Sequence, residues 1–430
     1  MKKPVFIYFL LIPVLIVLGG CKDTEPGDQD NATPTTTTTI AAAAGSGTYA
    51  VVDTGQTSCY SAAGAEIDCP VENNDFHGQD GVYPGADPGY IDNGDGTVTD
   101  VNTGLMWQQD PGSKMSWDAA VSGAETFVLG GYTDWRLPTI KELYSLILFS
   151  GLDPSGYESG DTSGMVPFID TGYFNFEYGD TGAGERIIDS QWATSTRYVS
   201  TTMNGDATMF GVNFADGRIK GYGLTDPRTR EDKTFFVVYV RGNMAYGINN
   251  FEDNGDGTVT DYATGLMWMQ SDSGHLGAGD GGDGALTWEQ ALTWGENLSY
   301  ADYHDWRLPD AKELQSLVDY TRSPATTGSA AIDPLFRVTK IVDEGGGTNY
   351  PFYWTGTTHA NMVNGSNAVY VAFGEALGWM QSPFGDYTLM DVHGAGAQRS
   401  DPKAGDPGEY PYGHGPQGDV IRIYNYARCV

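Results

Sequence analysis

The sequence predicts an α+β protein built from two tandem copies of one domain, and two repeated motifs carry this prediction. The first motif occurs 161 residues apart, as Asp92-Asn-Gly-Asp-Gly-Thr-Val-Thr-Asp100 with Thr103-Gly-Leu-Met-Trp107, and as Asp253–Asp261 with Thr264–Trp268. The second motif follows in each copy, beginning Asp134-Trp-Arg-Leu-Pro and Asp305-Trp-Arg-Leu-Pro. Two motifs repeated in a fixed order indicate a duplicated domain. The period is long, so we expect each copy to fold around a core of its own.

Length and composition agree with two domains and an N-terminal extension. At roughly 150 residues per domain, 430 residues accommodate both copies. The 59 Gly and 21 Pro predict that long loops join the short strands. We therefore divide the chain into a signal peptide (1–20), a Thr/Ala-rich tether (21–48), a small cysteine-containing segment (49–85), a first copy (86–246) and a second copy (247–430).

The N-terminus has the pattern of a bacterial export signal. Lys2 and Lys3 precede an apolar run from Pro4 to Leu18, and Leu18-Gly-Gly-Cys21 resembles the lipobox of bacterial lipoproteins. The resemblance implies lipidation of Cys21 and cleavage before it. A transmembrane anchor is the alternative, but this apolar run is shorter than the ~20 residues that span a bilayer. We predict an outer-membrane lipoprotein, facing the cell surface or the periplasm and touching the membrane only through its lipid.

The next segments predict a flexible tether and then a disulfide. Residues 22–48 carry almost no large apolar side chain, so they cannot offset the chain entropy lost on folding. Cys59 and Cys69 close a small loop, which in an exported protein indicates a disulfide. Cys429 is left without a partner, either buried in the last strand or free to form an intermolecular bridge.

The charge balance excludes one class of partner. The chain has 23 Lys and Arg against 56 Asp and Glu, a net charge of −33. Loss of residues 1–20 removes Lys2 and Lys3 and no acid, which leaves −35. Such a field repels polyphosphates, so we predict no nucleic-acid partner.

Local patterns predict the elements of each copy. The Asn/Asp/Gly cluster at 93–96 predicts a β-hairpin, and Leu105–Trp107 predicts a short strand. Apolar residues spaced three and four apart predict a helix from Trp117 and another from Trp288. A capping box, Thr139 with Glu142 and Asp310 with Glu313, opens a second helix in each copy.

The later part of each copy predicts antiparallel strands. We match Trp192–Thr196 with Trp354–Thr358, and 207–214 with 367–373. Each copy then closes on an apolar strand, Phe235–Arg241 in the first and Val420–Arg428 in the second. Two helices followed by short strands with long loops make an α+β domain.

In their order, these motifs resemble a known family. NGDGTVTD, TGLMW, DWRLPT-x-KEL, W-x-T-[ST]-T, V-x-F and a terminal VR or ARCV are similar to the C-terminal domain of the Legionella collagen-like adhesin (Lcl) and its bacterial relatives. The resemblance covers residues 86–242 and 248–430. It implies a C-type-lectin-like fold and extracellular recognition; the adhesin itself binds sulfated glycosaminoglycans. This chain departs from it in having no collagen-like repeat and a strongly acidic charge.

The repeated acids have two interpretations. Clustered carboxylates invite calcium, yet counting an EF-hand loop from Asp92 places Gly94 and Gly96 where oxygen ligands are needed. We therefore favour hairpin turns made by Asx hydrogen bonds and glycines, and predict no cofactor, with calcium as the alternative. The residues concerned are Asp92, Asp95, Asp100, Asp253, Asp256 and Asp261.

The repeated Trp and Arg residues also have two interpretations. An Arg of the Trp-Arg motif could grip a ligand carboxylate or sulfate. We favour a structural role, in which the Arg pairs with a nearby acid and the Trp packs between helix and sheet. This core motif comprises Trp107, Trp135, Arg136, Trp268, Trp306 and Arg307.

The sequence favours a binding protein over an enzyme. Trp135-Arg-Leu-Pro-Thr139 also resembles the formylglycine-generating enzyme group, but a thiol pair for its copper is missing from the late part of either copy. No pair of acids stands out for a glycosidase. We predict that tandem lectin-like domains bind an extracellular glycan or surface protein and catalyse nothing. The alternative is an envelope assembly protein with aromatic loops as subunit contacts.

Overall fold

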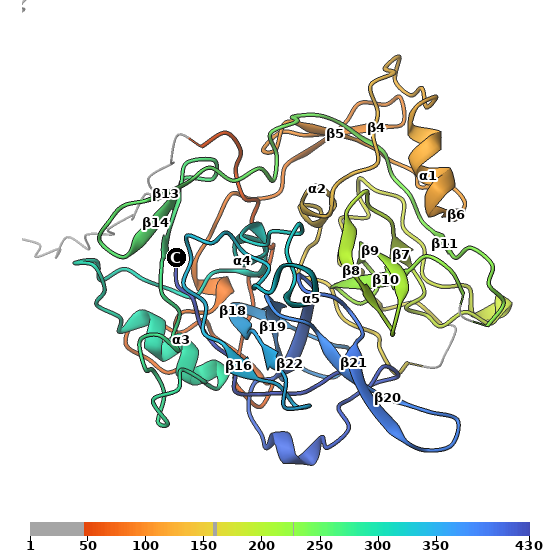
Figure 1. Cartoon of the computed structure of the whole chain (residues 1–430). Helices are drawn as coiled ribbons and strands as arrows, with labels where there is room; N and C mark the ends of the chain where they lie inside the picture. The colour runs from red at the N-terminus through yellow and green to blue at the C-terminus, as the bar shows by residue number, and fades with distance from the viewer. Residues whose placement is uncertain (1–46, 158–160, 227) are drawn as a thin grey trace, which may run out of the picture. The chain divides into compact units, whose positions relative to one another are not determined.

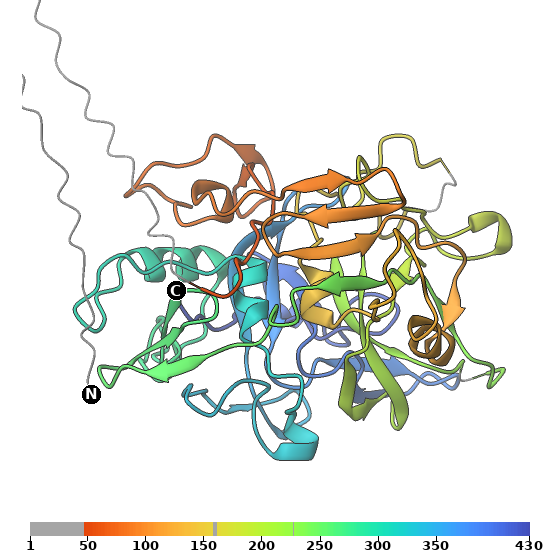
Figure 2. The ribbon, with the colours of Figure 1, turned by 90° about the horizontal axis from the view of Figure 1, so that it is seen from above.

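The computed structural model describes residues 47–157, 161–226 and 228–430. The predicted signal peptide, the lipidation site at Cys21 and the tether up to residue 46 lie outside the described residues. Within that part of the chain, none of the helices is long and apolar enough to cross a membrane. Short helices and mostly small antiparallel sheets make up the fold, in two tandem copies (Figure 1, Figure 2).

Both repeated Asp/Gly motifs form the predicted β-hairpin. The first copy has a four-stranded antiparallel sheet in the order β12-β5-β4-β3, and the second has the three-stranded sheet β13-β14-β15. Val98 and Val259 are buried at matching positions in the second strand of each hairpin. The strands are β3 (Tyr90–Asp92), β4 (Thr97–Asp100), β5 (Leu105–Gln108), β12 (Val240–Gly242), β13 (Phe251–Asp253), β14 (Thr258–Asp261) and β15 (Leu266–Met269).

The two helices predicted in each copy are present, and their caps explain where they begin. Thr139 and Asp310 accept hydrogen bonds from the backbone N–H of Glu142 and Glu313, and each Glu side chain accepts from the N-cap N–H, completing both capping boxes. A short third helix follows in the second copy. The helices are α1 (Trp117–Ala124), α2 (Ile140–Tyr144), α3 (Trp288–Glu296), α4 (Ala311–Ser316) and α5 (Pro324–Thr327).

A seven-stranded sheet runs through both copies. Its order is β18-β19-β22-β10-β9-β7, with β8 also pairing β9. The copies join where β10 of the first pairs with β22 of the second, Ile219 opposite Gln398. The strands are β7 (Gln191–Trp192), β8 (Arg197–Thr202), β9 (Asp206–Asn213), β10 (Arg218–Gly223), β18 (Phe352–His359), β19 (Asn367–Ala372) and β22 (Gln398–Pro402).

Smaller elements complete the fold. The predicted disulfide between Cys59 and Cys69 is present, and β1 pairs with β2 inside its loop. In the second copy, the β20–β21 hairpin is inserted between β19 and β22, whereas β9 leads directly into β10 in the first copy. These elements are β1 (Cys59–Tyr60), β2 (Glu66–Ile67), β6 (Met115–Ser116), β11 (Thr234–Phe235), β16 (Ile341–Val342), β17 (Thr348–Asn349), β20 (Leu377–Gln381), β21 (Tyr387–Asp391), and the 3-10 turns η1 (Asp80–Val82), η2 (Thr181–Ala183) and η3 (Pro407–Glu409).

The two copies are related by an internal two-fold correspondence centred on α2 and α4. Lys141 Nζ donates to the carbonyl of Ser316 at 2.6 Å, and Lys312 Nζ donates to the carbonyl of Ser145 at 2.9 Å. Lys141 is equivalent to Lys312, and Ser145 to Ser316. Each copy therefore contacts the other with the same residues, as in an isologous dimer interface.

The hydrogen bonds correct one detail of the sequence matching. The hydroxyl of Thr194 donates to the carbonyl of Phe210, and that of Thr355 donates to the carbonyl of Val369. Thr196 and Thr357 in turn accept from the first N–H of α2 and α4. The equivalent of Trp192 is therefore Tyr353 and not Trp354, a shift of one residue.

The expectation of separate cores is wrong in part. One hydrophobic cluster belongs to the first copy and includes Trp135, and a second, around Trp288 and Trp306, belongs almost wholly to the second copy. A third and larger cluster draws on both copies, with Leu143 of α2 and Leu314 of α4 in it. The second helices of the two copies were expected to pack in separate cores, but both contribute to this one.

The closing segments differ from the predicted strands. Between Phe235 and Arg241 only the ends lie in strands, and Val420–Arg428 contains no strand in the described structure. In the second copy single bridges take the place of the strand, because Asn425 pairs with Leu286 and Tyr426 pairs with Tyr353. At the chain end Arg307 and Val430 exchange two backbone hydrogen bonds, as Arg136 and Val240 do in the first copy. Cys429 is buried, which is incompatible with an intermolecular bridge from the folded protein, and burial raises its pKa.

Because the copies share a core, we predict that Leu143→Ala destabilises both of them. Removing a buried Leu side chain costs about 2–5 kcal/mol. Urea unfolding followed by tryptophan fluorescence should give one transition, shifted to lower urea, since buried Trp residues of both copies report together. Val121→Ala, on the exposed face of α1, serves as the control and should change little. Two separate transitions, with only one of them shifted, would contradict the shared core.

Candidate functional site

The repeated acids of the first copy are occupied in forming the hairpin turn. Asp92 Oδ1 accepts from the N–H of Gly94 at 2.8 Å. Asp95 Oδ1 accepts from the N–H and the hydroxyl of Thr97 at 3.1 and 2.6 Å. Gly94 and Gly96 both have positive φ, which favours glycine. These are the contacts of an Asx-type turn.

The second hairpin repeats the same bonds. Asp253 accepts from the N–H of Gly255, and Asp256 accepts from Thr258. Asp100 and Asp261 lie apart from these turns and cap the next one, where Asp100 accepts from the N–H of Asn102 and Asp261 from that of Ala263. Across the described residues, no group of three or more His, Cys, Asp or Glu side chains is arranged to hold a metal.

The Trp-Arg motifs form part of the helix starts. Arg307 holds Glu313 of the capping box through two hydrogen bonds of 2.7 Å, whereas Arg136 holds Glu142 through one, from Nη2 to Oε1. Burial disfavours the charged form of Glu313, but the charge of Arg307 prevails and lowers its pKa. Trp107, Trp135, Trp268 and Trp306 are all buried. The Arg of each motif thus holds the start of α2 or α4, and the Trp residues anchor the motif in the hydrophobic core.

An aromatic cleft of about 560 Å³ lies in the second copy. Three aromatic side chains line it, Trp379 on β20, Tyr410 after η3, and Tyr424 near the C-terminus. Pro407 and Pro411 add rigid apolar surface. Such a concave surface of rings with few polar groups is typical of ligand sites.

A single ion pair supplies the charged groups of the cleft. Arg422 Nε and Nη2 donate to the two carboxylate oxygens of Glu344 at 2.8 and 3.1 Å. The guanidinium also lies 3.9 Å from the ring centre of Phe352. The two hydrogen bonds to Glu344 and the contact with the Phe352 ring fix the Arg422 side chain. An ion pair held in this way can form hydrogen bonds with hydroxyl groups of a ligand.

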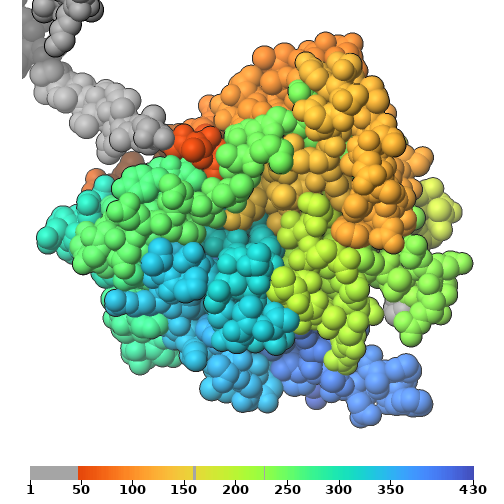
Figure 3. Space-filling model, turned by 45° about the horizontal axis from the view of Figure 1, so that its top comes forward, coloured from red at the N-terminus to blue at the C-terminus, as the bar shows by residue number. Residues whose placement is uncertain are grey.

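The rings continue from the cleft onto an exposed surface. Trp379 meets Tyr412 edge-on at 6.1 Å, and Tyr412 stacks on Tyr387 at 3.9 Å between ring centres. Tyr412 is 50% exposed and Phe384, at the tip of the β20–β21 hairpin, is 94% exposed. By the colour bar of Figure 3, this hairpin lies in the blue region that projects at the lower right.

Close backbone contacts hold the cleft open at a fixed position. The N–H of Trp379 donates to the carbonyl of Gly418 at 2.8 Å. A Cβ at Gly418 would lie 2.2 Å from the carbonyl oxygen of Trp379, so glycine is required there. Asp419 next to it accepts from His393 Nε2 at 2.8 Å and pairs with Arg399. The Trp379 contacts tie the 407–420 loop to the hairpin, and the Asp419 contacts tie it to His393, just after the hairpin, and to β22.

The base of the hairpin is fixed to the first copy. Tyr198 of β8 donates its hydroxyl to Asp391 Oδ2 at 2.8 Å, and Gly394 donates its N–H to Asp391 Oδ1 at 2.7 Å. Burial outweighs these bonds and raises the pKa of Asp391 to about 7. The carboxyl group is therefore mostly protonated in mildly acidic solution.

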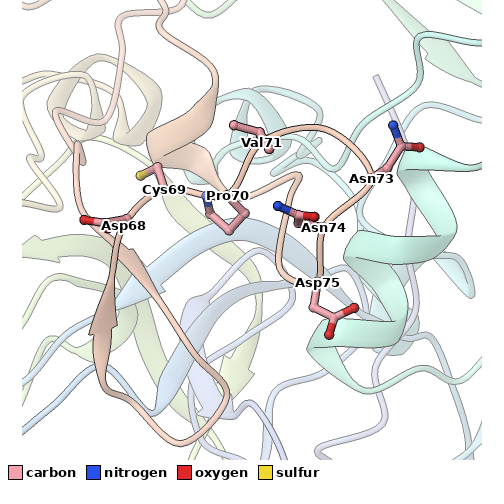
Figure 4. A pocket seen from close by; sticks show the side chains of 7 residues that line it. All are labelled: Asp68, Cys69, Pro70, Val71, Asn73, Asn74 and Asp75. Atoms are coloured by element: carbon pink, nitrogen blue, oxygen red, sulfur yellow. The ribbon is translucent and has the colours of Figure 1, made fainter.

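A second hollow is a weaker candidate. It has a volume of about 540 Å³ and lies on the loop 68–75 beside the disulfide. Figure 4 shows this loop with its seven lining side chains, none of which is aromatic. This hollow offers a ligand less aromatic surface than the aromatic cleft does.

Sequence reasoning missed the aromatic cleft. Its residues come from segments between 344 and 424, and none belongs to a repeated motif. The available signal was the unmatched sequence after β19, where Trp379, Phe384 and Tyr387 occur in an insertion that the first copy lacks.

The fold defines a tandem α+β protein with an aromatic cleft in its second copy. The family described as the Lcl C-terminal domain matches residues 96–241 and 257–388, more than half of the chain, and the protein belongs to this family. Membership indicates an adhesin-like role at the cell surface. No curated protein and no solved structure matches the chain.

Because the hairpin acids already accept bonds from their own turns, we predict no selective calcium binding. Calcium and magnesium at the same millimolar concentration should raise the melting temperature equally and slightly, as salts screen the acidic chain. Scanning calorimetry compares the wild type with Asp92→Asn combined with Asp95→Asn. A rise specific to calcium that the double variant loses would contradict this, since a ligand of the native state stabilises it by mass action.

The raised pKa of Asp391 predicts a pH-dependent stability. The folded state keeps a proton that the unfolded chain releases above its ordinary pKa of 3.8, so stability falls as pH rises from about 4 to about 7. The loss should be about 2–4 kcal/mol at most. Asp391→Asn should flatten this part of the pH profile measured by urea unfolding. An unchanged slope would show that Asp391 is ionised throughout.

Proposed function

We propose that this protein is a lipid-anchored recognition protein that binds a glycan in the aromatic cleft of its second copy. The supporting observation is the continuous ring surface of Trp379, Tyr412 and Tyr387 next to the Arg422–Glu344 pair. Rings can cover the apolar faces of a sugar, and the charged pair can bind its hydroxyl groups. The proposal includes a C-type-lectin-like fold for each copy and outer-membrane attachment through Cys21.

The proposed ligand is uncharged. Glu344 is the one acid that lines the cleft, and Arg422 already neutralises it. The net charge of −33 further disfavours a sulfated polymer. We therefore propose a neutral extracellular glycan, with no cofactor and no nucleic-acid partner.

We propose binding and no catalysis at this site. A glycosidase places two carboxyl groups on either side of the bond that it cleaves. Glu344 carries the single carboxyl group in the cleft lining, and both of its oxygens accept hydrogen bonds from Arg422. An acid held in this way is suited to fixing a ligand.

A second candidate function is assembly of the envelope. The observation that favours it is Phe384, whose side chain is almost fully exposed at the tip of a projecting hairpin. An exposed aromatic ring at such a position is typical of a protein contact. In this case the tip, and not the cleft, would carry the binding energy.

We predict that Trp379→Ala weakens glycan binding on a saccharide array by about tenfold, equivalent to ~1.4 kcal/mol. Tyr262→Ala is the matched control, because Tyr262 and Tyr412 are both 50% exposed but Tyr262 lies in the repeated hairpin region. Tyr412→Ala should reduce binding as well.

The same array separates the two candidate functions. Saccharide-dependent signal that Phe384→Ser leaves unchanged supports glycan recognition. If no saccharide binds and Phe384→Ser abolishes capture of an envelope protein, assembly is the function and the glycan proposal is wrong.

A further inference from the structure

A groove of about 380 Å³ lies between the two copies, beside α2. Its lining includes Thr196 and Lys141 from the first copy, and Ile248, Val318 and Tyr320 from the second. It is separate from the aromatic cleft and does not depend on the function proposed there. Because the two copies correspond residue by residue around α2 and α4, an equivalent position exists beside α4. We call this position the twin.

The chain itself fills the twin. There the carbonyl of Thr54 accepts from the N–H of Phe149 at 2.7 Å. Asp80 Oδ2 accepts from the hydroxyl of Thr357 at 2.6 Å and from that of Thr54 at 2.7 Å. Gln56 adds bonds to the backbone of Phe149 and Thr358. Within the filling segment, residues 54–56 with Asp80, the side chains of Thr54, Gln56 and Asp80 are buried.

The open groove presents the equivalent donors. Thr196 corresponds to Thr357, because each accepts from the first N–H of its helix, at 3.0 and 2.9 Å. Tyr320 corresponds to Phe149, because the preceding residues, Asp319 and Leu148, donate equivalent backbone bonds. Among the described residues, neither the Thr196 hydroxyl nor the Tyr320 N–H donates to an acceptor.

Charge around the groove is compatible with an acidic group. The Lys141 ammonium lies in the lining, donating to Asn249 Oδ1 at 2.8 Å and to the carbonyl of Ser316. The two acids of the lining are engaged in their own loops, Asp319 by Thr321 and Asp333 by Leu335. In the twin, Asp310 stands where the open groove has Thr139, so a carboxylate meets less repulsion in the open groove.

We propose that this groove binds an extended peptide segment of a partner protein. The peptide supplies a backbone carbonyl to the N–H of Tyr320 and an acidic side chain to the hydroxyl of Thr196, as residues 54–56 and Asp80 do in the twin. The exposed Ile248 side chain, 63% accessible, offers an apolar contact at the rim. The ligand class is thus a short acidic peptide in extended conformation.

The test uses the full mature chain and a fluorescent, end-blocked nonapeptide with the sequence of residues 50–58 in which Thr54, the residue that bonds Asp80 in the twin, is replaced by Glu, so that the peptide itself carries the required acid. Fluorescence anisotropy should show saturable binding, absent for the scrambled peptide. Thr196→Val, which removes the donor, should weaken binding about tenfold. Ile248→Asp, at an exposed side chain that does not endanger folding, should weaken it at least as much by repelling the acid. Thr126→Val, an exposed threonine outside the groove, should bind as the wild type does.

Three results would overturn the proposal. The first is no saturable binding at millimolar peptide. The second is binding that both groove variants leave unchanged, which places the peptide elsewhere. The third is binding that appears only in a chain beginning at residue 47, which would make the occupant the chain's own N-terminal segment and not a partner.

Discussion

The packing of α2 against α4 is the contact on which the rest of the structure depends. The lysine of each helix donates to a carbonyl at the end of the other, and Leu143 and Leu314 enter one cluster. Burial lowers the pKa of Lys141 to about 8, so each buried ammonium requires the acceptors that the partner copy provides. The two copies consequently fold as one unit, continued by the pairing of β10 with β22.

This pairing determines where binding sites can lie. The equivalent faces of the two copies are buried against each other. Ligand recognition therefore has to come from features that one copy has and the other lacks. Two such features concern binding sites: the β20–β21 insertion, which contributes Trp379 to the aromatic cleft, and the N-terminal segment, which fills one of two equivalent grooves. The correspondence between the copies gives the stable frame, and the differences between them give the distinct surfaces.

Local structure could be predicted from the sequence where the signal was local. The Asp92–Asp100 hairpin, the capping boxes at Thr139 and Asp310, and the disulfide depend on residues close in the chain, and all are present. The shared core could not be predicted, because an apolar helix face looks the same whether it packs on its own domain or on another. The cleft was missed for a related reason, since Glu344 and Arg422 meet only in the folded chain.

The distribution of charge explains why an acidic protein can still bury so many cations. Arg218 forms ion pairs with Asp153 and Asp216, and Lys220 bonds to Asp216, at the junction of the copies. The charge of Arg218 helps to hold the pKa of Asp153 low despite burial. With these cations consumed internally, the surface is left with the excess acid. At the aromatic cleft, where the only lining cation, Arg422, is already paired with Glu344, an anionic ligand would meet that field unopposed, whereas a neutral one is recognised by rings and hydrogen bonds alone.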